Sequence, residues 1–266
     1  MRFSNLHQHS NFSDGKNTPE EVVLSAIEKN MESIGFSDHS FTEIDQSYCM
    51  KLERYNDYYA EINRLKEKYK DKITVFLGIE KDYYSDIDRE KFDYVIASVH
   101  YIYANGVCHP IDHSRVQQET YIETECNGDI LKFAKDYYEL VIKNVRDTKP
   151  DVVGHFDVIS KFGLIDEENP EYREIAKSAL SEVLKVCPVI EMNTGAISRR
   201  VKDIPYPHPF LLEFILQNGG EIMLSADSHA KETVCFYFEE CVEMLKKIGF
   251  THIVKLTENG MVREAI

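Results

Sequence analysis

Residues 6–15 read LHQHSNFSDG, and the rest of the chain is best understood outward from this stretch. A short apolar run ends here in His7 and His9, which are two residues apart. On a β-strand, that spacing points both imidazoles to the same face. A turn follows at once and carries Asp14 before Gly15. The pattern predicts a strand whose C-terminal end delivers two imidazoles and, shortly afterwards, a carboxylate.

Six further apolar runs end in similar polar clusters, so the first stretch is one case of a repeated design. Asp227 and His229 repeat the two-residue spacing of His7 and His9. The clusters are Ser37-Asp38-His39-Ser40, Gly78-Ile79-Glu80, Ser98-Val99-His100, Gly154-His155-Phe156-Asp157, Glu191-Met192-Asn193-Thr194 and Ser225-Ala226-Asp227-Ser228-His229. Seven strand ends that each carry histidine or an acidic residue imply a shared polar site.

The apolar runs alternate with longer helical patterns, which is typical of parallel α/β proteins. Strands are expected at 6–9, 34–37, 75–80, 95–100, 152–155, 189–193 and 222–226, with a last one at 252–257. Thr18 and Pro19 predict a helix start, as N-cap and first helical residue. Further helices are expected at about 51–70, 117–147, 171–186, 208–218 and 232–248. Periodicity alone allows an open doubly wound sheet or a closed barrel. The barrel is favoured because its strand ends converge on one face.

Composition narrows the class of protein. The 266 residues include 31 Lys plus Arg and 46 Asp plus Glu, a formal net charge of −15. So acidic a chain is not expected to bind nucleic acid, and no apolar run approaches the length of a membrane span. Six scattered cysteines without a C-x-x-C pair, and the absence of a secretory signal, predict a cytoplasmic protein. No composition shift marks a boundary, so residues 1–266 are expected to form one domain.

The polar clusters together predict a site for more than one metal ion. Imidazole and carboxylate ligands without thiolate suit Zn²⁺, Mn²⁺ or Fe²⁺. A single catalytic zinc needs only three protein ligands, and this chain offers nine candidates, enough for two or three divalent ions. Paired metal ions of this kind commonly hydrolyse phosphate esters. The nine candidate ligands are His7, His9, Asp14, His39, Glu80, His100, His155, Asp227 and His229.

These motifs, in this order along nearly the whole chain, resemble the PHP (polymerase and histidinol phosphatase) superfamily. Within it, the chain looks like the stand-alone histidinol-phosphate phosphatases. The resemblance implies an α/β fold, a distorted (β/α)7 TIM-like barrel, with a trinuclear metal site at the C-terminal ends of the strands. It implies that His7, His9, Glu80 and Asp227 hold one ion and that Glu80 bridges to a second. His100 and His155 would complete the second site, and Asp14, His39 and His229 would hold the third.

The resemblance also suggests roles for residues around the metals. Basic side chains near the rim would hold the phosphate, and the candidates are Arg199, Arg200 and, more weakly, Lys161. Glu80, Asp227 and His229 are expected to act directly in catalysis. Asp38 and Asp157 are expected to orient ligand imidazoles or, for Asp157, to cap a helix. Glu191 and Asn193 share one strand face and are expected to support the site through hydrogen bonds.

The expected activity is hydrolysis of L-histidinol phosphate to L-histidinol and phosphate, a step of histidine biosynthesis, through in-line attack by a hydroxide that bridges two metals. Glu43 and Asp45 are candidates to recognise the histidinol part. One alternative keeps the site and changes the ester to a nucleotide, phosphosugar or phosphotyrosine. Another is an inactive metal-binding scaffold. A deaminase or amidohydrolase is less favoured because no expected strand ends in lysine. A small phosphate ester is the expected partner, and the sequence carries no signal of an oligomeric state.

Overall fold

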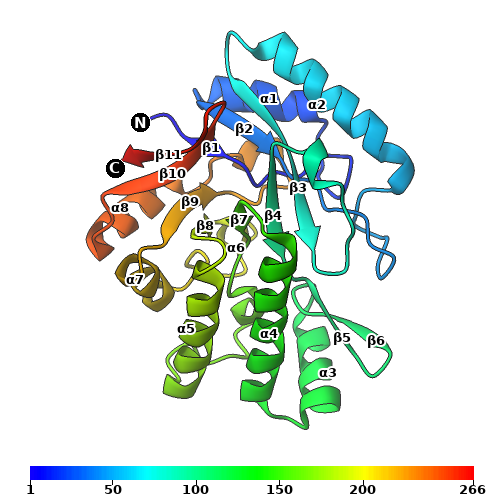
Figure 1. Cartoon of the computed structure of the whole chain (residues 1–266), viewed down its shortest axis with the longest axis vertical. Coiled ribbons are helices and arrows are strands. Elements are labelled where there is room, and N and C mark those ends of the chain that lie inside the picture. The colour runs from blue at the N-terminus through cyan, green and yellow to red at the C-terminus, as the bar shows by residue number, and fades with distance from the viewer.

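Seven parallel strands form a nearly closed barrel in the computed structural model, which describes all 266 residues (Figure 1). They are hydrogen-bonded in the order β1-β2-β3-β4-β7-β8-β9, so each strand pairs with the next barrel strand along the chain. This confirms the barrel and the parallel arrangement. The strands are β1 (Ser4–Asn5), β2 (Ser33–Phe36), β3 (Thr74–Asp82), β4 (Tyr94–Ser98), β7 (Val152–Val153), β8 (Val189–Asn193) and β9 (Glu221–Ser225).

The barrel closes through the segments that follow its first and last strands. Gln8 forms an isolated parallel bridge with Ser228. The His9 amide donates to the Ser228 carbonyl at 2.9 Å, and the Ser228 amide donates to the His7 carbonyl at 3.3 Å. The chain segments that carry candidate ligands from the first and last strands therefore lie side by side.

Helices cover the outside of the barrel, and α3, α4 and α5 form a row along one side (Figure 1). Only a 3-10 turn, Arg89–Lys91, lies between β3 and β4, which makes the barrel irregular there. No helix is both long and apolar enough to cross a membrane. The helices are α1 (Pro19–Glu28), α2 (Tyr55–Tyr69), α3 (Arg115–Cys126), α4 (Ile130–Thr148), α5 (Pro170–Leu184), α6 (Gly195–Ser198), α7 (Pro209–Gln217) and α8 (Phe238–Ile248).

The helix start predicted at Thr18 is confirmed. The Thr18 side chain accepts a hydrogen bond from the Glu21 amide, and Glu21 reciprocates at the Thr18 amide. The single helix expected over 117–147 is wrong, because the chain breaks between α3 and α4. Asn127 and Gly128 adopt left-handed backbone angles with φ of 52° and 80°, and the Asp129 side chain caps the next helix.

Two antiparallel hairpins were not expected from the sequence. One joins β5 (Tyr101–Ala104) to β6 (Val107–Pro110) through a turn at Asn105 and Gly106, and it projects beside α3 (Figure 1). The other pairs the expected last strand, β10 (His252–Thr257), with β11 (Gly260–Ala265). The Asn-Gly pair is a strong hairpin signal, so the first hairpin could have been predicted.

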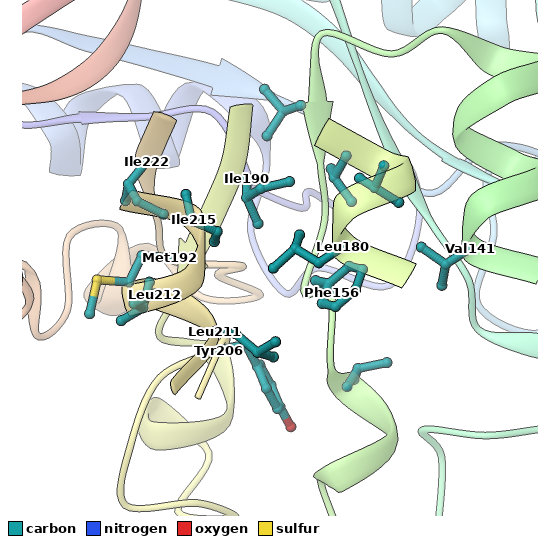
Figure 2. Close-up of a cluster of buried hydrophobic side chains, with 14 of the residues drawn as sticks. Val141, Phe156, Leu180, Ile190, Met192, Tyr206, Leu211, Leu212, Ile215 and Ile222 are labelled. Atoms are coloured by element: carbon teal, nitrogen blue, oxygen red, sulfur yellow. The ribbon is translucent and has the colours of Figure 1, made fainter. Parts of the chain in front are cut away.

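The barrel interior is filled partly by the fully buried ring of Tyr94. The two strands next to β4 in the sheet, β3 and then β2, make room for it with glycines: a Cβ at Gly35 would lie 2.4 Å from the Tyr94 hydroxyl oxygen, and one at Gly78 would lie 2.2 Å from its Cζ. Outside the barrel, Ile190 and Met192 of β8 belong to the cluster that includes Leu180 of α5 and Leu212 of α7 (Figure 2). A filled interior leaves only the C-terminal end of the strands open for a site.

Candidate metal centre

The nine candidate ligands meet at the C-terminal end of the barrel. Glu80 is the centre of the group, because it lies on β3 and is almost completely buried. Its Oε2 is 3.2 Å from His7 Nε2 and 2.8 Å from His39 Nδ1. Its Oε1 is 3.1 Å from His155 Nε2 and 3.3 Å from His100 Nε2. The two oxygens of one carboxylate therefore face two separate sets of imidazoles.

On the Oε2 side of Glu80, His7 and His9 converge with Asp227. The Asp227 Oδ1 lies 3.3 Å from His9 Nε2 and 3.8 Å from His7 Nε2. His7, His9 and Glu80 place ligand atoms within 4.8 Å of one another. On the Oε1 side, the Nε2 atoms of His100 and His155 are 3.3 Å apart. Each side of Glu80 thus offers a compact set of nitrogen and oxygen donors.

A third set surrounds Asp14 nearer the surface. Asp14 Oδ2 is 3.2 Å from His229 Nε2, and Asp14 Oδ1 is 3.8 Å from His39 Nε2. His9 adjoins this set, since its Nδ1 is 3.8 Å from Asp14 Oδ1. All four residues place ligand atoms within 4.8 Å of one another. The sets overlap, because His39, Glu80 and His100 also place ligand atoms within 4.8 Å of one another, so the division of the ligands among individual ions stays a prediction.

The donors fit divalent ions because several of them are buried without any hydrogen-bond partner. These atoms include Nε2 of His7, both ring nitrogens of His9 and Oε2 of Glu80. A buried polar atom without a partner is costly, and native proteins rarely leave one unsatisfied. A cation held between these atoms would satisfy them together. The chemistry of the set, imidazole and carboxylate only, is that of zinc, manganese and iron sites.

The electrostatics of the cluster act on its members in different directions. Burial lowers the pKa values of His7, His39 and His100, but the neighbouring carboxylates outweigh it and raise them, so a bound cation would displace protons from these rings. Burial, together with the neighbouring imidazoles of His229 and His39, lowers the pKa of His9 to about 3, which keeps its ring neutral. Burial alone would raise the pKa of Glu80, but the imidazoles of His7 and His39 hold it well below its usual value. A neutral imidazole and an ionised carboxylate are the forms that bind metal ions.

Glu191 and Asn193 form a buried layer of hydrogen bonds beneath the ligands. Glu191 Oε2 lies 2.8 Å from His7 Nδ1, and its Oε1 accepts from the His155 amide at 2.5 Å and from Asn193 Nδ2 at 2.7 Å. Asn193 Oδ1 in turn accepts from the Gly195 amide at 2.8 Å. One carboxylate thereby fixes residues from two ligand-bearing strand ends.

Asp82 was missed in the sequence analysis, although it supports His100 directly. Its Oδ2 accepts from the His100 amide at 2.9 Å and lies 3.3 Å from His100 Nδ1. The available signal was its position two residues after Glu80 on the same strand, which places both carboxylates on one face.

Two expectations about neighbouring aspartates are wrong, because neither side chain bonds a ligand imidazole. Asp38 accepts hydrogen bonds from the amides of Ser10 and Ser13 and from both hydroxyls, and so fixes the loop between His9 and Asp14. Asp157 Oδ2 accepts from the His208 amide at 2.9 Å and provides no side-chain cap to the following turn. Burial raises the pKa of Asp157 to about 6.

A cavity of about 530 Å³ opens above the ligands. Only two of the three basic residues expected to bind the phosphate line this cavity. Arg199 and Lys161 line the cavity, whereas Arg200 is exposed and does not. Arg199 Nη2 is 3.0 Å from Asp227 Oδ2, and its Nη1 donates to the Asp227 carbonyl at 3.1 Å. Asp227 has a left-handed φ of 44°, so the guanidinium braces a strained turn.

The other residues that line the cavity differ in part from those expected to recognise the substrate. Asp45 lines the cavity, but Glu43 is exposed outside it. His113 also lines it, although no motif had marked it. The side chain of Lys161 already has a hydrogen-bond partner, because its Nζ donates to the Asp112 carbonyl at 2.6 Å. Tyr48, Tyr101 and Asp112 also line the cavity, and no sequence motif marks them.

The fold is a parallel barrel, and its open end holds imidazoles and carboxylates around a cavity. This arrangement is that of a metal-dependent hydrolase. The PHP domain model matches residues 5–195, and the chain belongs to the PHP domain family. The matched part carries His7, His155 and all candidate ligands between them, while Asp227 and His229 lie beyond it.

Individual relatives extend this similarity over most of the chain. The probable histidinol-phosphatase of Deinococcus radiodurans is 31% identical over 242 residues, 87% of this chain and 88% of that protein. The histidinol-phosphatase of Lactococcus lactis is 28% identical over 278 residues, 98% of this chain and 96% of that protein. The crystal structure of the lactococcal histidinol phosphate phosphatase with zinc, L-histidinol and phosphate superposes with a TM-score of 0.74 at 24% identity, covering 98% and 99% of the two chains.

Proposed function

We propose that this chain is a metal-dependent phosphomonoesterase that hydrolyses L-histidinol phosphate to L-histidinol and phosphate, and so serves histidine biosynthesis. The observation that carries the proposal is the position of Glu80 between two sets of imidazoles, with a third set around Asp14. The relatives in Deinococcus radiodurans and Lactococcus lactis, which bear the histidinol-phosphatase name, support the choice of substrate.

Two or three divalent ions, of zinc, manganese or iron, are the cofactors that the donors suit. When bound, they would polarise the phosphate and lower the pKa of the attacking water, as divalent ions do in phosphoesterases. Glu80 would help to hold two of them, because its oxygens face His7 and His39 on one side and His100 and His155 on the other.

Arg199 is the side chain best placed to bind the phosphate. It lines the cavity and presents a planar fork of donors, the geometry that pairs with two phosphate oxygens. Its contact with Asp227 fixes the guanidinium beside the metal ligands. Lys161 is a less favourable candidate because its ammonium already donates to the Asp112 carbonyl.

The setting of this activity is also part of the proposal. All six cysteines are free thiols in the structure, which suits the reducing cytoplasm. The substrate is a small phosphate ester, and neither nucleic acid nor a membrane is proposed as a partner. The assignment of residues 1–266 to one domain stays a prediction.

Phosphate release from L-histidinol phosphate by protein loaded with Zn²⁺ or Mn²⁺ tests the proposal. Nucleotides, sugar phosphates and phosphotyrosine serve as competitors under the same conditions. We expect kcat/KM of about 10⁴ M⁻¹s⁻¹ or above for L-histidinol phosphate, the lower end of the range of ordinary enzymes, and values lower by orders of magnitude for the others. A competitor that is hydrolysed faster would overturn the substrate assignment and leave the phosphoesterase assignment standing. No turnover by metal-loaded protein would overturn both.

A further inference from the structure

The cavity above the metal centre is lined by both basic and acidic residues, and the two kinds meet where Lys161 lies 3.5 Å from the Asp112 carboxylate. Arg199 and Lys161 come from the loops after β8 and β7. The lining also includes two carboxylates and two phenol rings from the loop after β2, from β5 and from the segment after β6, namely Asp45, Tyr48, Tyr101 and Asp112. We call these four residues the acidic aromatic wall. Metal ions held by the ligands would bind an anion together with Arg199, but anion binding gives no reason for further carboxylates in the same cavity.

The aromatic part of this wall directly adjoins the metal ligands. The Tyr48 ring meets the His39 ring edge to face, with centroids 4.7 Å apart, and it stacks on Tyr101 at 5.8 Å and an interplanar angle of 25°. The hydroxyl of Tyr48 is buried and has no hydrogen-bond partner. An ester whose phosphate reaches the metals would therefore lay the rest of its alcohol along these rings.

Asp45 is held in place at the outer end of the aromatic pair. Its Oδ2 accepts from the Tyr101 hydroxyl at 3.0 Å, and its Oδ1 accepts from the Ser47 amide at 2.9 Å. Each oxygen keeps one lone pair for a further donor. A fixed carboxylate beside stacked rings suits a flat ring that carries an N–H group.

Asp112 lies closer to the metals. The preceding Ile111 donates its amide to the carbonyl of the ligand His100 at 2.9 Å, so Asp112 follows directly after a residue paired with a ligand. Lys161 binds the backbone carbonyl of Asp112 at 2.6 Å but is 3.5 Å from its carboxylate. The carboxylate is thus incompletely paired and is able to accept a strong donor such as an ammonium group.

We propose that the acidic aromatic wall binds the alcohol part of the ester, with Asp112 accepting from its ammonium group and Asp45, Tyr48 and Tyr101 holding its imidazole. This inference rests on the proposed function and deepens it. In L-histidinol phosphate the ammonium is the nearer group to the ester oxygen and the imidazole is farther away. That order matches a carboxylate beside His100 and a second one at the far end of the Tyr101 ring.

The wall also discriminates against other esters. The uncharged sugar of a sugar phosphate would cover Asp45 and Asp112 without supplying a cation. A nucleotide with more than one phosphate would bring further negative charge toward them. Buried polar groups left without partners are the usual source of strong discrimination between substrates. The selected class is therefore phosphate monoesters of cationic amino alcohols that carry a flat ring.

The test compares the Asp112→Asn and Asp45→Asn variants on three substrates. These are L-histidinol phosphate, imidazolylpropyl phosphate, which lacks the ammonium, and phosphoethanolamine, which lacks the imidazole. For Asp112→Asn we expect the ratio of kcat/KM for L-histidinol phosphate over imidazolylpropyl phosphate to fall about 10- to 100-fold, the range for a hydrogen bond to a charged group. For Asp45→Asn we expect the ratio of L-histidinol phosphate over phosphoethanolamine to fall by several-fold or more.

Matched variants keep the test specific. Glu43→Gln removes one negative charge from the same loop as Asp45 but outside the cavity, so its substrate ratios should equal those of the wild type. Tyr101→Phe removes the hydroxyl that holds Asp45 and should lower the same ratio as Asp45→Asn, to a smaller extent. Bound metal and thermal unfolding are measured for each variant, and Tyr101→Phe carries the test if an aspartate variant does not fold.

Equal losses on all substrates, or ratios that change as much in Glu43→Gln, would overturn the inference. Failure of the proposed function would give a different result in the activity assays. In that case the metal-loaded wild type would hydrolyse p-nitrophenyl phosphate but not L-histidinol phosphate, and the assignment of this wall would fall with it.

Discussion

Replacing Glu80 with glutamine is the sharpest test of the metal centre, because both oxygens of this side chain face imidazoles. Oε2 faces His7 and His39, and Oε1 faces His100 and His155, all at 2.8 to 3.3 Å. An amide can keep only one acceptor oxygen. Whichever way it is oriented, its NH₂ group points a donor at one set of ligands, where a cation would be bound.

The expected magnitude follows from the burial of the carboxylate, whose side chain is fully inaccessible. Removing one partner of a buried charge pair typically costs about 3–5 kcal/mol. At about 1.4 kcal/mol per tenfold, that is a loss of roughly a hundredfold to several thousandfold in metal affinity. We therefore expect Glu80→Gln to lose at least one metal ion per chain, with kcat/KM falling by a similar factor.

The assay is elemental analysis of metal per chain after dialysis, together with kcat/KM for L-histidinol phosphate and circular dichroism to check folding. Asp82→Asn is the matched control, because it lies on the same strand and His100 is the only candidate ligand that its side chain contacts. Its amide can still accept from the His100 backbone, so we expect a smaller loss, of about 10- to 100-fold. A Glu80→Gln protein with wild-type metal content and near-wild-type turnover would refute the bridging role.

Three further predictions concern the cavity, the barrel interior and the metals. Arg199→Gln should lower kcat/KM about a hundredfold in steady-state assays. Arg200→Gln, which alters an exposed side chain outside the cavity, should stay within about threefold of the wild type. Equal effects of the two substitutions would contradict the assignment of phosphate binding to Arg199. Gly78→Ala places a Cβ 2.2 Å from the Tyr94 ring and should destabilise the fold by more than about 2 kcal/mol in denaturant unfolding, and an unchanged midpoint would show that Tyr94 moves freely. Dialysis against a chelator should abolish turnover and lower Tm, because ions that bind only the folded state stabilise it, and Zn²⁺ or Mn²⁺ should restore both; full activity in protein shown to be free of metal would exclude a metal-dependent reaction.

The strand ends and the candidate ligands could be predicted because their signals are local. Each barrel strand ends in a short polar cluster next to an apolar run, and parallel strands in a barrel must bring those clusters to one end. The two-residue spacing of His7 and His9 places both on one face, which the structure shows at the centre of the site. Sequence position was therefore enough to predict that the nine candidate ligands meet.

The partners of individual side chains were less predictable. Asp38 precedes a candidate ligand, His39, yet its carboxylate is directed to the loop at Ser10 and Ser13. Successive side chains alternate in direction along an extended chain, so a neighbour of a ligand in sequence often faces elsewhere. The acidic aromatic wall depends on tertiary contacts, because the β5–β6 hairpin alone brings Asp112 beside His100. No motif in the sequence records that contact.

The net charge of −15 is compatible with an anionic substrate because electrostatic effects in the cavity are local. Exposed charges are screened over about 8 Å at physiological ionic strength, so distant surface carboxylates contribute little. Within the cavity, bound metal ions and Arg199 would attract phosphate, while Asp45 and Asp112 would attract a cation. A substrate bound the wrong way round would place its phosphate against two carboxylates. The acidic aromatic wall would therefore select the orientation of the ester as well as its identity.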